Sequence, residues 1–233
     1  MLNTFFQLIL FIQFNTGIDY QKIFGDDYTN ALNYLKKNKL EIQSQLNKQA
    51  VDKEMIIPVI FPERIRYSIV SDLIETAAVE LVYIEYGSDY VDFSIGDFQI
   101  KPSFAEMVEM EIVKSADLRE KYRNLISYSK TALSDIRKER VQKLKSLEYQ
   151  MIYIAAFYDM VMLKFNLNEK SKTGKIEFLA AAYNHGFADG ESEIEKCIGN
   201  KFFPFGAKYG GKQFAYTDIA VDFYLNHYQS VFK

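Results

Sequence analysis

Apolar residues in this chain recur mostly at the spacing of one face of a helix. After the acidic pair Asp26 and Asp27, which suits a helix start, such positions are Tyr28, Ala31, Leu32 and Leu35. Between residues 147 and 165 apolar side chains cover nearly every face, which is typical of a helix in the middle of a protein. Asp159 and Lys164 argue against a membrane span there. The pattern predicts a helical protein with a buried central helix.

Further helices are expected along the chain. Residues 103–106 form a Ser-Phe-Ala-Glu capping box directly after Pro102, so a helix should begin there. Residues 116–146 indicate a long polar helix or a helical pair, and residues 176–183 a short helix that ends at Gly186. Thr217 is placed to cap a final helix over residues 218–228. Residues 52–86 are mostly helix-forming, with Asp52 as a candidate cap, but Pro58 and Pro62 are expected to interrupt them.

Strand-like sequence is confined to a short stretch. Residues 90–100 alternate loosely between apolar and polar positions and contain β-forming residues, which indicates a small hairpin or an extended loop. Residues 199–211 are rich in glycine and aromatic residues, and we expect them to be irregular. The predicted fold class is therefore mainly α, with a small β element.

The N-terminal segment differs from the rest. Residues 1–14 are predominantly apolar, which is too short for a membrane span of roughly 20 residues but suits the apolar part of an export signal. No Lys or Arg precedes the run and no Ala-x-Ala site follows it, so a buried N-terminal segment is the alternative. The predicted division is a signal-like segment over 1–20, a helical extension over 21–50 and one main domain over 51–233.

Composition excludes several classes of function. A formal net charge of −3 and a pI of about 5.6 give no electrostatic reason to expect nucleic acid as a partner. Cys197 is the only cysteine, so no intramolecular disulfide can form. No cluster of His, Cys and acidic residues has metal-ligand spacing, and no glycine-rich phosphate loop is present. We expect neither a metal nor a cofactor.

Two short motifs carry the strongest functional signal. The first is Gly96-Asp97-Phe98-Gln99-Ile100-Lys101-Pro102 and the second is Ala181-Ala182-Tyr183-Asn184-His185-Gly186. In this order, with helical sequence between them, they resemble the paired signatures of the lysozyme-like lytic transglycosylases, whose superfamily includes the goose-type lysozymes. Those signatures are a Gly-Leu-Met-Gln-Ile-x-Pro run and an Ala-Ala-Tyr-Asn-Ala-Gly run. The resemblance covers roughly residues 50–190 and implies an α+β lysozyme-like domain in which a small β-hairpin flanks a glycan cleft.

The resemblance implies one carboxylic acid that protonates the leaving sugar oxygen, with a pKa raised by apolar surroundings. Residues 51–63 look like the family's helix that ends in this acid, which makes Glu63 the first candidate. Glu75, followed by Thr, resembles the family's Glu-Ser pair and is the alternative acid. Arg64 replaces the family's Ser, and its guanidinium would lower the pKa of Glu63 unless it points away. A helix beginning at Pro62 would place Glu63 in the first turn, where the helix dipole favours the charged form.

The two motifs supply the expected substrate-binding residues. Gly96 would let the backbone approach a sugar ring, and Gln99 offers both a hydrogen-bond donor and an acceptor. In the family, the tyrosine at the position of Tyr183 lies near the acid, and Asn184 is placed to contact sugar. His185, which replaces the family's Ala, is expected to be a wall residue rather than a proton carrier. Asp92 precedes the first motif, and we expect it to be a turn or cap residue, with a second catalytic carboxylate as the lesser alternative.

Taken together, these features indicate an enzyme that cleaves the bond between N-acetylmuramic acid and N-acetylglucosamine. The first expectation is a lytic transglycosylase that uses a single glutamate and acts on peptidoglycan strands in the cell envelope, in the periplasm or after secretion. One alternative is a muramidase that hydrolyses the same bond. The other is a catalytically inactive, lysozyme-shaped glycan-binding or scaffold protein.

Overall fold

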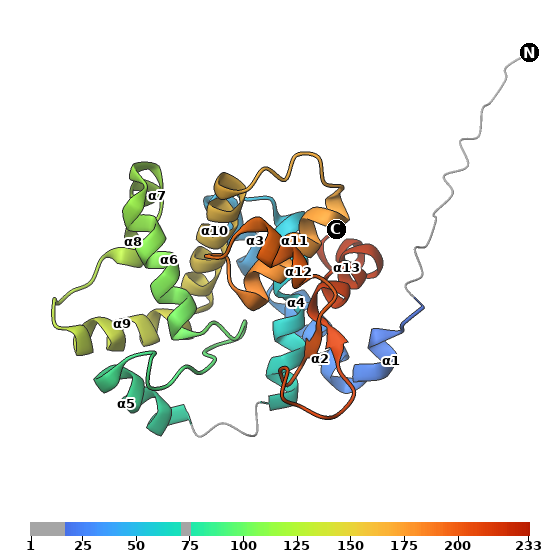
Figure 1. Ribbon diagram of the computed structural model, residues 1–233, viewed down its shortest axis with the longest axis horizontal. Helices are drawn as coiled ribbons and strands as arrows, with labels where there is room; N and C mark the ends of the chain where they lie inside the picture. The colour runs from blue at the N-terminus through green and yellow to red at the C-terminus, as the bar shows by residue number, and fades with distance from the viewer. Residues whose placement is uncertain (1–16, 71–75) are drawn as a thin grey trace, which may run out of the picture.

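The computed structural model describes residues 17–70 and 76–233, and within these ranges the chain forms fourteen helices and one two-stranded sheet (Figure 1). The helices are α1 (Tyr20–Phe24), α2 (Asp26–Lys37), α3 (Lys39–Lys48), α4 (Lys53–Val70), α5 (Thr76–Tyr86), α6 (Pro102–Lys114), α7 (Ala116–Lys121), α8 (Arg123–Ile126), α9 (Leu133–Lys145), α10 (Leu147–Lys164), α11 (Lys172–His185), α12 (Glu191–Lys196), α13 (Tyr216–Asn226) and α14 (Tyr228–Phe232). Strand β1 (Lys201–Phe203) pairs antiparallel with β2 (Phe214–Ala215). The mainly α class is confirmed. Glu75 and the apolar run over residues 1–14 lie outside the described residues.

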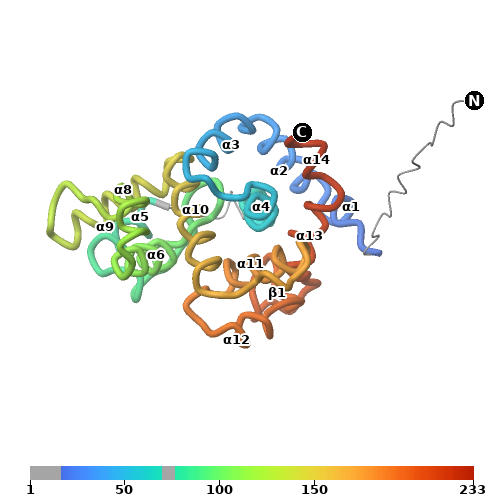
Figure 2. Tube along the Cα trace, turned by 90° about the horizontal axis from the view of Figure 1, so that it is seen from above, coloured from blue at the N-terminus to red at the C-terminus, as the bar shows by residue number. Residues whose placement is uncertain are grey.

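Helix α4 occupies the centre of the molecule. In the view of Figure 2 it is seen nearly end-on, with α2, α3, α10, α11 and α13 around it, and it packs against each of them. Its buried side chains point to all sides and are completely inaccessible at Ile56, Ile57, Val59, Ile60 and Phe61. A helix that is apolar all round is stable only inside a protein, which explains this position. None of the helices in the described ranges is long and apolar enough to span a membrane.

The expectation that Pro58 and Pro62 break this helix is wrong, because α4 runs through both. Asp52 starts the helix, accepting a hydrogen bond from the Glu54 backbone N–H at 2.9 Å. Each interior proline costs about 3 kcal/mol, whereas each large apolar side chain buried from water contributes about 1.5–3 kcal/mol. The five inaccessible side chains therefore outweigh the two prolines. Consequently Glu63 lies well inside α4 and not in the first turn of a helix.

Residues 21–50 are helical, as expected, and pack into the same core as the rest of the chain. The face of α2 predicted from the pattern is buried at all four positions: Tyr28, Ala31, Leu32 and Leu35. Ile42 and Leu46 of α3 are also inaccessible and belong to the same hydrophobic cluster. Helix α10 likewise matches the predicted buried helix.

Helices α5 to α9 form a second group beside the helices around α4 (Figure 1). Residues 116–146 were expected to form one long helix or a helical pair. They form three helices instead: α7, α8 and α9. The buried ammonium of Lys143, in α9, donates to the carbonyls of Asn124, Leu125 and Ser127 at 2.8–3.1 Å. These carbonyls lie where α8 ends, so a long-range contact satisfies groups that a continuing helix would have used.

Of the two alternatives predicted for residues 90–100, the loop is confirmed and the hairpin is wrong, and residues 199–211, expected to be irregular, contain β1. Residues 90–100 form a loop with a single antiparallel bridge between Ile95 and Ile100, whereas the two-stranded sheet uses residues 201–203 and 214–215. The backbones of Gly96 and Gln99 both have positive φ, which closes a tight turn after one bridge. The predicted cap of the final helix is also wrong, because Thr217 lies inside α13 and its Oγ1 accepts from the Gly199 N–H at 3.1 Å.

Candidate active site

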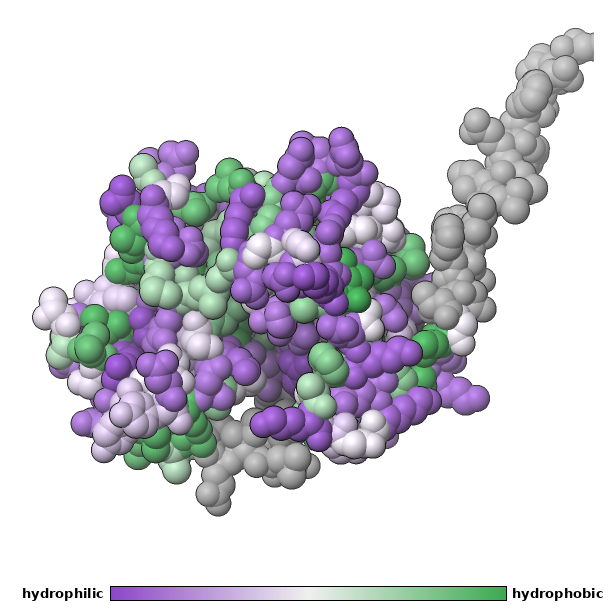
Figure 3. All heavy atoms as spheres, in the orientation of Figure 1, coloured by the Kyte–Doolittle hydropathy of each residue, from purple (hydrophilic) through white to green (hydrophobic). Residues whose placement is uncertain are grey.

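A pocket of about 310 Å³ lies where the two groups of helices meet. Its walls come from α4, from the start of α6, from the loop over residues 92–101 and from the end of α11. The surface between the two groups is hollowed and largely hydrophilic (Figure 3). Five of the predicted site residues line this one pocket: Glu63, Gln99, Tyr183, Asn184 and His185. The fold thus brings together positions separated by up to 122 residues.

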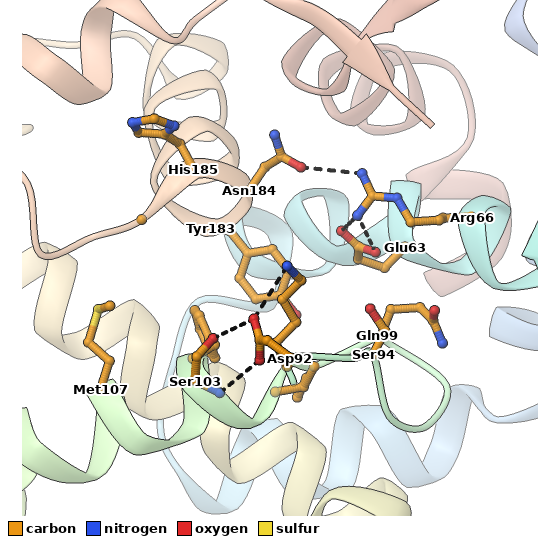
Figure 4. Close-up of a pocket in the computed structure, with 14 residues that line it drawn as sticks. Glu63, Arg66, Asp92, Ser94, Gln99, Ser103, Met107, Tyr183, Asn184 and His185 are labelled. Atoms are coloured by element: carbon orange, nitrogen blue, oxygen red, sulfur yellow. Dashed lines mark hydrogen bonds and ion pairs between the residues drawn. The ribbon is translucent and has the colours of Figure 1, made fainter. Parts of the chain in front are cut away.

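Glu63 has the surroundings expected of a general acid. Only 3% of the residue is exposed, and the carboxyl faces the pocket together with Tyr183 and Gln99 (Figure 4). Burial raises the pKa of Glu63, while Arg66, Tyr216 and Lys101 act in the opposite direction. The net direction is upward. A carboxylic acid with a raised pKa can hold a proton where an exposed glutamate would already have lost it.

Arg66 is the most important site residue that the sequence did not single out. It lies one turn after Glu63 on α4, and its Nη1 donates to both carboxyl oxygens, at 2.7 and 2.9 Å. Its Nη2 donates to Asn184 Oδ1 at 3.3 Å, and its Nε to the Pro204 carbonyl at 3.2 Å. The i, i+3 spacing of Glu63 and Arg66 is the available sequence signal, because such positions are neighbours on a helix.

Arg64, which raised doubt about Glu63, points away from it. Its Nη1 donates to the backbone oxygen of Asp97 at 2.8 Å and to the Asp97 carboxylate at 2.9 Å. The guanidinium carbon lies 3.7 Å from the ring centroid of Tyr34 and 4.4 Å from that of Tyr67. Arg64 therefore attaches the loop over residues 92–101 to α4, and Arg66 is the guanidinium that contacts the acid.

Gly96 does not line the pocket, so its expected approach to a sugar is replaced by a structural role. Its φ is +72°, and an added Cβ would lie 2.6 Å from the Leu144 carbonyl oxygen and 2.3 Å from Gln150 Nε2. Gln150 is fully buried on α10, and its Oε1 accepts from the Phe98 N–H at 2.9 Å. Glycine is required because the turn packs directly against the chain around Gln150.

That turn presents Gln99 to the pocket. Gln99 is only 8% exposed and has a φ of +51°, an uncommon value for a residue other than glycine. Its Nε2 donates to the Gly96 carbonyl at 3.0 Å, so the contact that a glycan would make falls to the amide oxygen. Backbone strain of this kind is characteristic of functional sites.

Two tyrosines stand close to the acid. The Tyr183 hydroxyl donates to the Phe98 carbonyl at 3.3 Å, which joins α11 to the turn. The Tyr216 hydroxyl, from α13, donates to the Val59 carbonyl at 2.8 Å and lies beside Glu63. Burial, and then the charge of Glu63, raise the pKa of both tyrosines well above the ordinary value. Both therefore stay protonated at neutral pH. The sequence had predicted neither the hydrogen bond from Tyr183 to the Phe98 carbonyl nor the position of Tyr216 beside Glu63.

Asn184 and His185 form the outer wall. Asn184 is exposed, and its Oδ1 accepts the hydrogen bond from Arg66. The His185 side chain is 51% exposed and its Nε2 lies 3.6 Å from a carboxylate oxygen of Asp189. No contact between His185 and Glu63 is formed, which agrees with the wall position expected of it.

Asp92 is a helix cap, the role favoured by the sequence. Its carboxylate accepts from the Ser103 N–H at 3.2 Å and from the Ser103 hydroxyl at 2.8 Å, at the start of α6. The predicted capping box is wrong, because Glu106 accepts instead from the hydroxyls of Tyr83 and Ser88. A carboxylate from the preceding loop satisfies the start of the helix better than Ser103, which lies inside it.

The arrangement suits proton transfer to a bound polar ligand. It combines a buried carboxyl, hydroxyl and amide groups, and a hydrophilic surface around the opening. Within residues 17–70 and 76–233 no group of three or more His, Cys, Asp and Glu side chains is placed to hold a metal ion. Comparison of the chain with protein-family models, with curated proteins and with solved structures finds no match in any of the three.

Proposed function

We propose that this protein is a lysozyme-like lytic transglycosylase that cleaves the bond between N-acetylmuramic acid and N-acetylglucosamine in peptidoglycan. The observation that carries the proposal is the pocket shared by Glu63, Gln99 and Tyr183. These residues come from three separate segments, and each was chosen from the sequence by its place in a family-like motif. A cell-envelope, periplasmic or secreted location follows from the proposed substrate.

Glu63 acts first as an acid and then as a base. The protonated carboxyl gives its proton to the glycosidic oxygen, the C1–O bond breaks, and N-acetylglucosamine leaves with a 4-hydroxyl. The resulting carboxylate takes the proton of the muramic acid 6-hydroxyl as that oxygen bonds to C1. The product is a 1,6-anhydro end, no water is consumed, and Glu63 regains its proton.

The neighbouring groups have roles consistent with this chemistry. Tyr183 and Gln99, which carry a hydroxyl and an amide, line the same pocket as Glu63 (Figure 4). Among the described residues that line the pocket, the other carboxylate is that of Asp92, which is engaged in capping α6. An enzyme with a single available carboxyl fits the transglycosylase better than a muramidase that needs a second carboxylate or a held water.

The ion pair with Arg66 favours a second candidate, an inactive glycan-binding protein. A guanidinium at 2.7 Å stabilises the carboxylate form, which cannot donate a proton. In this candidate the pocket would still recognise glycan through Gln99 and Asn184, but no bond would be cleaved. The two candidates differ in whether any muropeptide product forms.

The test is mass spectrometry of muropeptides released from purified peptidoglycan by the wild-type protein, by Glu63→Gln and by Glu120→Gln. Glu120 is exposed on α7 and controls for the loss of a carboxyl charge. We expect anhydro products from the wild type and from Glu120→Gln, and release slower by at least about 100-fold from Glu63→Gln, as for loss of a general acid. Reducing-end products instead would identify a muramidase. Binding without release would favour the inactive candidate.

A further inference from the structure

The guanidinium of Arg66 meets three separate parts of the fold. Nη1 contacts the acid on the same helix, Nη2 contacts Asn184 at the end of α11, and Nε contacts Pro204 just after β1. The guanidinium carbon also lies 5.0 Å from the ring centroid of Phe203. Because a guanidinium is planar and rigid, anchoring two of its nitrogens fixes the direction in which the third points.

We propose that Arg66 is a positioning residue that orients the Glu63 carboxyl and sets its proton affinity, and that it does so through its anchors on α11 and on the segment after β1. This inference rests on the proposed function for its role in the reaction. The effect of the Arg66 guanidinium on the Glu63 carboxyl is a property of the free protein and is measurable without substrate.

Among the charged and titratable groups around Glu63, Arg66 has the largest effect on the proton affinity of the carboxyl. Tyr183 faces it from α11, Tyr216 from α13, and Lys101 from the loop before α6. Both tyrosines are neutral at physiological pH, and the Lys101 side chain is 55% exposed and paired with Asp92 at 3.4 Å. Arg66 alone, among the described residues, brings a full positive charge to hydrogen-bond distance of both carboxyl oxygens.

Two opposing effects therefore act on Glu63. Burial raises its pKa, and Arg66 is the largest of the effects that lower it. An opposite charge within hydrogen-bond distance lowers a carboxyl pKa by about 1–3 units, which is a 10- to 1000-fold change in proton affinity. Without Arg66, burial would act almost unopposed and Glu63 would keep its proton to a higher pH.

For catalysis this balance matters in both half-reactions. The first needs a protonated Glu63 and the second needs its carboxylate, so the most useful proton affinity lies near the working pH. Arg66 prevents burial from making Glu63 too weak an acid to give up its proton in the first half-reaction. Its side chain is 22% exposed and lines the pocket, so it lies where a bound sugar would meet the same guanidinium.

The experiment is an NMR titration of the Glu63 side-chain carboxyl in protein labelled with ¹³C-glutamate, with Glu63→Gln used to assign the signal. Arg66→Met keeps the length of the side chain and removes the charge. We expect its Glu63 midpoint to rise by an amount equal to at least a tenfold tighter proton affinity. Arg119→Met, an exposed position on α7, should leave the midpoint unchanged and controls for net charge.

Arg66→Lys separates charge from anchoring. A lysine keeps the positive charge but lacks the planar fork that reaches the acid, Asn184 and Pro204 together. We expect a Glu63 midpoint close to that of the wild type, with release of muropeptides at least tenfold slower. Equal turnover in Arg66→Lys and the wild type would contradict the positioning role.

A measurement on the wild type covers the case in which Arg66→Met does not fold. The Arg66 guanidinium ¹⁵N signals should shift with the same midpoint as the Glu63 carboxyl. Independent midpoints, or an unchanged midpoint in folded Arg66→Met, would overturn the proposal. If Arg66→Met shifts the midpoint but the wild type releases no muropeptide, the control of Glu63 stands and the proposed function fails.

Discussion

Gly96→Ala tests how the turn beneath the pocket is held. An alanine at φ +72° adopts a left-handed backbone conformation, which costs about 1–2 kcal/mol for a residue with a Cβ. The Cβ also meets the Gln150 side chain and the Leu144 carbonyl oxygen, and the latter is backbone that cannot rotate away. Moving Gln150 breaks its hydrogen bond to the Phe98 N–H, and an unpaired buried group costs about 1–3 kcal/mol. The expected loss in the free energy of unfolding is therefore about 2–5 kcal/mol.

Urea unfolding followed by circular dichroism measures this loss. Gly210→Ala is the matched control, because Gly210 has no positive φ and an added Cβ would meet nothing within 4 Å. We expect the control to lie within about 0.5 kcal/mol of the wild type. Because Gln99 shares the turn, Gly96→Ala should also slow muropeptide release in solutions where it is still folded.

The reasoning is refuted if Gly96→Ala unfolds within about 0.5 kcal/mol of the wild type. That result would mean that the turn does not pack against α10 as described. A large loss of stability with normal release by the folded fraction would show that the turn supports the fold without positioning Gln99.

Two further predictions concern single side chains. Tyr183→Phe removes the hydroxyl that donates to the Phe98 carbonyl in the pocket shared with Glu63, so muropeptide release should fall at least tenfold while the free energy of unfolding falls by about 1 kcal/mol. Unchanged release would show that this hydroxyl serves the fold alone. Burial lowers the pKa of His227, so the unfolded chain, with a pKa of about 6.5, binds the proton more readily. Stability from this residue is complete above about pH 6.5 and is lost as the pH falls toward the lower folded pKa. Urea unfolding of His227→Phe should show a shallower decline over that acidic range, and an identical decline would exclude His227 as its source.

The helical elements were predictable where the residues of a single segment determine whether that segment is helical. The buried face of α2 and the all-round apolar α10 follow from spacing alone. Prediction failed where distant groups intervened. Burial on all sides carries α4 through Pro58 and Pro62, and Lys143 ends α8 by binding its carbonyls.

The residues of the candidate site also divide into those that could be predicted from local sequence and those that could not. Glu63, Gln99 and Tyr183 were chosen from motifs, and all three line one pocket. The role expected of Gly96 was wrong, because the groups that require a glycine there, Leu144 on α9 and Gln150 on α10, are 48 or more residues away in the sequence. Arg66 was missed although its i, i+3 spacing from Glu63 was available, and Tyr216 was missed because nothing in its local sequence shows that it faces Glu63.

The amino-acid sequence was enough to predict the helical class, the buried helix α10 and the types of side chain available for chemistry. These properties depend on intrinsic preferences and on spacing within one segment. The partners that fix Arg64 and Arg66 became known from the fold, because Asp97, Asn184 and Pro204 come from segments far from α4 in the sequence. Arg64 meets Asp97 and Arg66 meets Glu63, since a turn of 100° per residue separates side chains that the sequence places almost together.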